Sequence, residues 1–186
     1  MIDPRTPVLV GAGQVVVRDG DPPSPAEMMT EAARAAAADA GAPALLDRVG
    51  VLAVVDAMSQ PLATPAIEAP TLWRSGLGGN GPQALVCDLC DAIAGGSLDV
   101  AVVCGAEAMT PFSAAIKAGE APPWPMEGRD ADRQLSKDAP MDGASAAEQA
   151  AGLIAPIFLY PLIEHAVRAD ATRGVQRSSR TAAGRR

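Results

Sequence analysis

The chain has 186 residues, of which 48 % are hydrophobic and 20 % charged, a balance typical of a globular protein with a core of its own. The formal net charge is −7, and because residues 171–186 contribute +5 through five arginines, residues 1–170 carry −12. Such an acidic body argues against nucleic-acid binding. The absence of a long apolar run and of a basic-then-apolar leader argues against a membrane span and a secretory signal. Three cysteines, an odd number without disulfide-like density, indicate a reducing compartment, so we expect a cytoplasmic protein.

The first part of the chain predicts alternating strands and helices. In chain order we expect a β-rich stretch at 7–17 with a glycine break, a helix at 24–40, a strand at 49–55, a proline-rich loop at 59–73, a helix at 80–95 and a strand at 98–104. Ser24 can cap the first helix, with Glu27 reaching back to it, and Gly41 can end it. Apolar strands separated by helices favour an α/β fold: a mostly parallel sheet with helices on both faces.

The composition changes after Thr110. Residues 119–145 are rich in Pro, Gly, Asp and Met, which indicates an exposed excursion. Short helices are expected at 145–151 and 157–169, with Pro156 and Pro161 as interruptions. The tail from Ala171 lacks apolar periodicity and is expected to be disordered. The predicted organisation is therefore an α/β part at 1–110, a helical lobe at 111–170 and a basic tail at 171–186.

Two glycine clusters suggest ligand binding. Gly11 and Gly13 follow an apolar run, but a dinucleotide-binding turn needs a third glycine where Val16 stands, so a strand with a glycine bend is favoured. Residues 76–81 hold four glycines in six positions and precede a helix. The backbone amides of Gly78, Gly79 and Asn80 could bind an anion, a carbonyl oxygen or part of a coenzyme. The alternative is a tight turn that only lets the helix pack on the sheet.

The ordered set of these segments resembles the thiolase family, in particular its lipid-transfer-protein type and acetyl-CoA acetyltransferase-like members. The likeness covers roughly residues 7–170 and is carried by the segments 8–14 (VLVGAGQ), 25–41, 78–85 (GGNGPQAL), 99–109 (DVAVVCGAEAM) and 147–156. It implies the N-terminal half of a layered thiolase-like fold with a helical loop lobe. It also implies an acyl-CoA C-acyltransferase that takes a coenzyme A thioester as substrate and needs no further cofactor.

Two departures from the family pattern bear on activity. The nucleophilic cysteine of thiolases falls on Gly78 or Gly79, and glycine offers no side chain to carry the acyl group. The second half, which in thiolases supplies a histidine and a second cysteine, does not follow. We therefore expect a truncated or frame-shifted product that is inactive. The alternative is a non-catalytic acyl-CoA-binding or interaction subunit of a lipid or sterol degradation complex.

A lone half is also expected to expose apolar surface and to associate with a second copy or with a complementary thiolase half.

The remaining candidates have ordinary structural explanations. Cys87 and Cys90 share a helix face, where core packing is expected because no second pair completes a metal site. Cys104 ends a strand and is expected to fill space, with a nucleophilic role as the alternative. His165 is expected to be structural or exposed. Glu107 follows the third strand, and we expect it to brace the turn by accepting backbone N–H groups rather than to act chemically.

Overall fold

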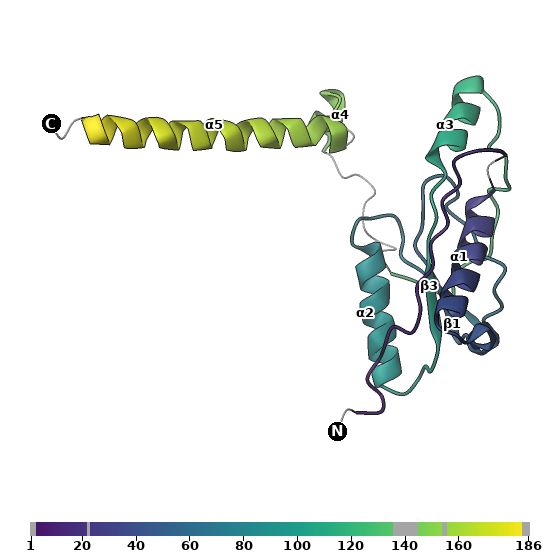
Figure 1. The fold of residues 1–186 in the computed structure, drawn as a ribbon. Coiled ribbons are helices and arrows are strands. Elements are labelled where there is room, and N and C mark those ends of the chain that lie inside the picture. Colours follow the sequence, from purple (N-terminus) through teal and green to yellow (C-terminus); the bar gives the residue numbers. More distant parts are fainter. Residues whose placement is uncertain (1–2, 22, 136–144, 154–155, 184–186) are drawn as a thin grey trace. The chain divides into compact units, whose positions relative to one another are not determined.

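The computed structural model describes residues 3–21, 23–135, 145–153 and 156–183 (Figure 1). Residues 1–139 and 140–186 form two compact units.

The first unit is built on a four-stranded, all-parallel sheet. Its strands are β1 (Val51–Val54), β2 (Thr71–Arg74), β3 (Ala101–Cys104) and β4 (Arg133–Gln134), in the order β3-β1-β2-β4. In the register of the sheet, Val54 lies beside both Arg74 and Cys104, so β1, β2 and β3 end together. The strands predicted at 49–55 and 98–104 are confirmed. The carboxyl ends of three strands therefore meet at one edge, where ligands commonly bind in α/β sheets.

Strand β2 corrects the prediction of a loop at 59–73. Only four residues pair, directly after Pro70, and their side chains alternate between half-buried and buried. So short a segment has no periodicity of its own to detect. It becomes a strand because it pairs with β1 on one side and β4 on the other, which is a tertiary effect.

Helices cover both faces of the sheet, as Figure 1 shows for α1 (Pro25–Asp39) and α2 (Gly81–Ala94). On one face Met29 of α1 packs in a buried cluster with Leu52, Val54, Ala63 and Leu72. On the other face Leu85 and Leu89 of α2 pack with Val51, Ala53 and Leu98. The α/β fold with a parallel sheet is thus confirmed.

Both helices begin close to where the sequence predicts. At α1 the capping box is complete: the Glu27 N–H donates to Ser24 Oγ at 3.2 Å, and the Ser24 N–H donates to Glu27 Oε2 at 2.8 Å. A 3₁₀ helix, η1 (Pro43–Arg48), follows α1, and α3 (Met109–Ala118) follows β3. Gly119 ends α3 with a φ of 72°, in the left-handed region that favours glycine.

The strand expected within 7–17 does not form. The segment is not assigned to a sheet and instead runs against α1. A Cβ on Gly11 would lie 2.2 Å from the carbonyl oxygen of Ala36, and one on Gly13 would lie 2.2 Å from that of Ala32. The two glycines therefore serve a close approach to the helix backbone, which takes the segment out of the sheet.

The second unit contains α4 (Ala146–Ala150) and α5 (Pro156–Ala183). Ser145 and Glu148 form a capping box at α4, as expected for a helix beginning there. Helix α5 begins at Pro156, contains Pro161 and continues through 171–183, where the sequence predicts disorder. Among the described residues, no helix combines the length and the apolar character that crossing a membrane requires.

We predict that Ser24→Ala lowers the free energy of unfolding by about 1 kcal/mol, because a hydroxyl that caps the helix packed on the core is lost. Urea denaturation followed by circular dichroism measures this change. Hydrogen bonds from the Ser24 backbone and side chain hold the pKa of Glu27 below its ordinary value. That pKa should rise in the variant, as NMR titration would show.

Ser145→Ala is the matched control, because it removes the same kind of cap from a helix of five residues with no buried side chain. Equal losses of stability in the two variants would contradict the prediction.

Candidate functional site

The loops that follow β1, β2 and β3 meet at the carboxyl edge of the sheet. The backbone N–H of Asp56, after β1, donates to Ser75 Oγ, after β2, at 3.1 Å. The backbone N–H groups of Met58 and Ser59 donate to the carboxylate of Glu107, after β3, at 3.1 Å each. Loops far apart in the sequence are thereby joined into one surface.

Glu107 braces this surface, as the sequence predicts. Besides the two N–H groups from the β1 loop, its carboxylate accepts the N–H of Ala108 at 3.1 Å. The same N–H also lies 3.0 Å from Ser59 Oγ. With its oxygens accepting three backbone donors, Glu107 is engaged in holding the loops.

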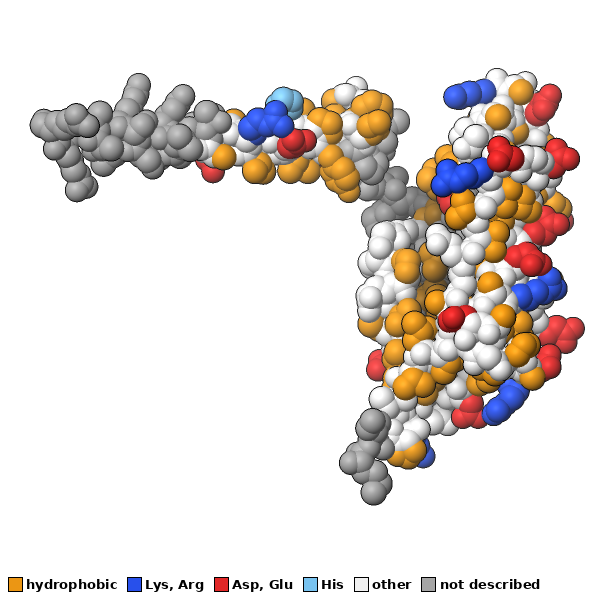
Figure 2. Space-filling model, in the orientation of Figure 1, with side chains coloured by type: hydrophobic (Ala, Val, Ile, Leu, Met, Phe, Trp, Pro, Cys, Tyr) orange, Lys and Arg blue, Asp and Glu red, His pale blue; other side chains and the backbone are white. Residues whose placement is uncertain are grey.

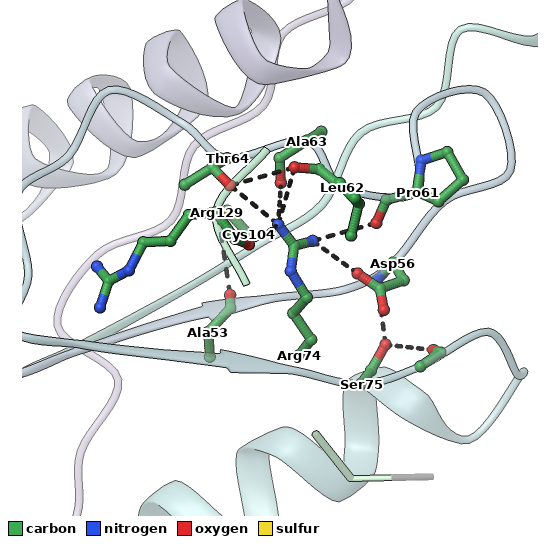
Figure 3. Close-up of polar contacts among 11 residues, drawn as sticks. Ala53, Asp56, Pro61, Leu62, Ala63, Thr64, Arg74, Ser75, Cys104 and Arg129 are labelled. Carbon is green, nitrogen blue, oxygen red and sulfur yellow. Dashed lines mark hydrogen bonds and ion pairs between the residues drawn. The ribbon is translucent and has the colours of Figure 1, made fainter. Parts of the chain in front are cut away.

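A buried ion pair lies beneath the loops (Figure 3). Nη1 of Arg74 lies 2.8 Å from Oδ1 of Asp56, and the two side chains are 2 % and 7 % exposed. Nη1 also donates to the carbonyl of Pro61, and Nη2 donates to those of Leu62 and Ala63 and to Oγ1 of Thr64, at 2.9–3.2 Å. Arg74 thus fastens the segment 61–64 to the end of β2.

The sequence reasoning missed this pair, although two signals were present. Asp56 directly follows the strand predicted at 49–55, and Arg74 lies two residues before the glycine-rich turn at 76–81. Charged residues at the ends of buried strands indicate either a site or a buried partner. Without the pairing of β1 with β2, nothing showed that the two lie opposite each other.

Cys104 lies near this cluster but is poorly suited to act as a nucleophile. Burial raises the pKa of its thiol to about 12, against a smaller opposing effect from the charge of Arg74. Its Sγ lies 3.8 Å from the carbonyl oxygen of Ala53. A thiol with this pKa is almost entirely protonated near neutral pH, which supports the prediction that Cys104 fills space.

The glycine-rich turn connects β2 to α2 and is tightly packed at both ends. Ser75 is buried, and its hydroxyl donates to the carbonyl of Gly76 at 2.6 Å. A Cβ on Gly81 would lie 2.8 Å from that of Ser75, so a side chain there would clash. Gly76 has a φ of 71°, in the left-handed region.

The middle of the turn is open. A Cβ on Gly79 would meet no atom within 4 Å, and Asn80, at the N-cap of α2, makes no capping hydrogen bond with its side chain. Gly78, Gly79 and Asn80 are exposed at a helix N-terminus, and Gly79 borders free space, whereas a Cβ on Gly78 would lie 3.2 Å from Oδ1 of Asn80. The amide groups there can attract an anion or a carbonyl oxygen, but no side chain at Gly78 or Gly79 can carry an acyl group.

The other candidate residues, Cys87, Cys90 and His165, lie on helices rather than in the loops at the carboxyl edge of the sheet. Cys90 is half-buried, but the expected core packing is wrong for Cys87, which is exposed and accepts a hydrogen bond from Gln83 Nε2 at 3.2 Å. His165 is exposed on α5. Within the described ranges, no cluster of three or more His, Cys, Asp or Glu residues is arranged to hold a metal ion.

Comparisons of the chain with family models, with curated proteins and with solved structures found no match.

We predict that Asp56→Asn lowers the free energy of unfolding by about 3–5 kcal/mol, because the charge of Arg74 stays buried without its counter-ion. Chemical denaturation measures the loss. The matched control is Glu31→Gln, which breaks the pair with Arg34, where both side chains are 59 % exposed. That variant should change stability by less than about 0.5 kcal/mol. Similar losses of stability from the two substitutions would show that the buried pair contributes no more to stability than an exposed one.

We also predict that iodoacetamide at pH 8 modifies Cys87 well before Cys104. A thiol with a pKa of about 12 holds only about one part in 10⁴ as thiolate at that pH. Raising the pH toward 12 should speed the reaction of Cys104, provided the protein remains folded. Peptide mass spectrometry with time measures both sites. Labelling of Cys104 at the rate of Cys87 at pH 8 would contradict the assignment of Cys104 as a half-buried, protonated thiol.

Proposed function

We propose that this chain is a thiolase-like protein that binds an acyl-CoA thioester at Gly78, Gly79 and Asn80 but does not transfer the acyl group. One observation carries the proposal. An open glycine turn lies at the carboxyl end of a strand in a parallel sheet and begins a helix, yet it contains no nucleophile. The ordered resemblance of the sequence to thiolases supplies the class of ligand.

The capacity to bind follows from the backbone. The N-terminus of α2 carries a partial positive charge, and the Asn80 side chain makes no capping hydrogen bond. The N–H of Gly81 already donates to the carbonyl of Gly78 at 3.1 Å and Pro82 has no N–H, so a ligand would bind the amides of the turn itself. Free space beside Gly79 allows a ligand oxygen to approach the backbone closely. A thioester carbonyl or a phosphate of coenzyme A has the oxygen acceptors that such a turn favours.

The lack of transfer follows from the cysteines. Thiolase chemistry passes the acyl group through a thioester on an activated sulfur, and the turn offers only glycine at that place. Cys104 cannot replace it readily, since burial keeps its thiol protonated. Cys87 lies on the second turn of α2 rather than at the helix N-terminus, where a thiol pKa is lowered.

A second candidate function is that of a non-catalytic interaction subunit. The large apolar side chains exposed between Val8 and Val17 favour it, because contiguous apolar surface marks contact sites. This role needs no ligand at the glycine turn. Titration calorimetry with acetyl-CoA distinguishes the two functions.

We predict that the wild-type chain binds acetyl-CoA in calorimetry and shows no thiolysis above background. Gly79→Asp should weaken binding at least about ten-fold, because it places a negative charge in the open space that an anionic ligand would use. Val86→Asp, on an exposed position further along α2, is the control and should bind like wild type.

Absence of binding by the wild type would favour the interaction subunit. Turnover that survives Cys104→Ala would show that a nucleophile has been overlooked.

A further inference from the structure

The segment 7–17 is an exposed, uncharged strip of chain. Val8, Leu9, Val10 and Val16 are 72 %, 89 %, 60 % and 62 % exposed. The segment follows an extended path over the first unit in Figure 1, and Figure 2 shows hydrophobic side chains on this side of the unit. Solvent-exposed residues with high β propensity on an extended backbone resemble an unpaired edge strand, and such a strand readily pairs with another strand.

The backbone of this segment is open to pairing. Within the described part of the chain, residues 7–18 make no backbone–backbone hydrogen bond, and the N–H of Ala12 donates to Oδ2 of Asp39 at 3.0 Å. Neighbouring residues of an extended chain direct their N–H groups to opposite edges. The N–H of Ala12 points to the edge that faces Asp39. The N–H and C=O groups of Leu9, Gly11, Gly13 and Val15 therefore point to the opposite edge.

The sequence of the segment is symmetric in character about Ala12. In an antiparallel pair of two copies centred on Ala12, Val8 lies opposite Val16, Leu9 opposite Val15, and Gly11 opposite Gly13. Most positions pair an apolar residue with another, and the two glycines coincide. The exception is Val10, which faces Gln14, while Pro7, opposite Val17, has no N–H to donate to the partner. A partner of unrelated sequence would not be expected to match both arms of this pattern.

The charges that flank the segment fit the same register. Centring on Ala12 places Arg5 of each copy opposite Asp19 of the other, which gives two opposite-charge pairs per dimer. In the described structure neither side chain forms an ion pair within its own chain. We propose that residues 5–19 form a symmetric antiparallel β-ribbon with a second copy of this chain, with the two-fold axis at Ala12.

The register makes a specific geometric prediction. The N–H of Ala12 is directed to Asp39 rather than to the partner. Ala12 of one copy therefore lies opposite Ala12 of the other, at a non-hydrogen-bonded position. Cα atoms at such positions are about 4.5 Å apart, within the range that a disulfide spans. Gln14 faces Val10 of the partner, so its two copies are offset by four residues, or about 13 Å along the strands.

Disulfide trapping tests this register in the full chain. In a background of Cys87→Ser, Cys90→Ser and Cys104→Ala, we expect Ala12→Cys to form a covalent dimer under mild oxidation. The control Gln14→Cys should remain mostly monomeric on non-reducing gels. Circular dichroism establishes that each variant is folded. Equal cross-linking of the two variants, or none of Ala12→Cys, would overturn the proposal.

Charge reversal tests the pairing independently, without added cysteines. Analytical ultracentrifugation of the otherwise wild-type chain should show Arg5→Asp and Asp19→Arg each weakening the dimer about ten-fold. The double variant Arg5→Asp/Asp19→Arg should restore it. A wild-type chain that remains monomeric at high concentration, or a double variant no tighter than the single ones, would refute the ribbon.

Hydrogen exchange further tests whether the segment pairs with a second copy or within its own chain. Protection of the amides of Leu9, Gly11, Gly13 and Val15, which face the partner, should increase with protein concentration. Protection already complete in the monomer would mean that the segment pairs within its own chain, and the proposal would fail. Acetyl-CoA binding at the glycine turn is measured separately, so neither proposal depends on the other.

Discussion

The buried contact between Arg74 and Asp56 is the interaction on which the carboxyl edge of the sheet depends. A guanidinium removed from water needs acceptors, and here a carboxylate, the carbonyls of 61–63 and the hydroxyl of Thr64 supply them. The pair joins the end of β2 to the loop after β1 and to a proline-rich stretch that has no regular structure of its own. The position of the glycine-rich turn at 76–81, which is separated from Arg74 only by Ser75, follows from it.

Two sets of polar contacts hold the loops together at this edge. Arg74 works below the loops with its side chain buried, and Glu107 works from the β3 loop by accepting backbone N–H groups. Both leave the middle of the glycine turn free. An open backbone surface held by such contacts is suited to binding, because less order is lost when a ligand meets groups that are already fixed by hydrogen bonds. Transfer chemistry would need in addition a reactive side chain, and the turn provides none.

The segment 7–17 shows how small residues redirect a chain. Its valines favour a strand, but Gly11 and Gly13 allow the backbone to approach α1 more closely than any side chain would permit. The segment gains a helix contact and stays outside the sheet. Its unpaired groups then remain available at an edge, a feature that proteins usually cover or pair. The symmetric pattern about Ala12 supplies a physical reason for one particular partner.

Local features of the sequence determined much of the fold. The capping box at Ser24, the glycine turn before α2 and the apolar runs of β1 and β3 each act over a few residues, and each formed as predicted. The bracing role of Glu107 was likewise predictable from its place after a strand. Tertiary structure alone decided that 71–74 is a strand, that Arg74 meets Asp56 across 18 positions, and that 7–17 lies on α1. Those outcomes depend on partners distant in sequence, and neither hydrophobic periodicity nor capping contains information about them.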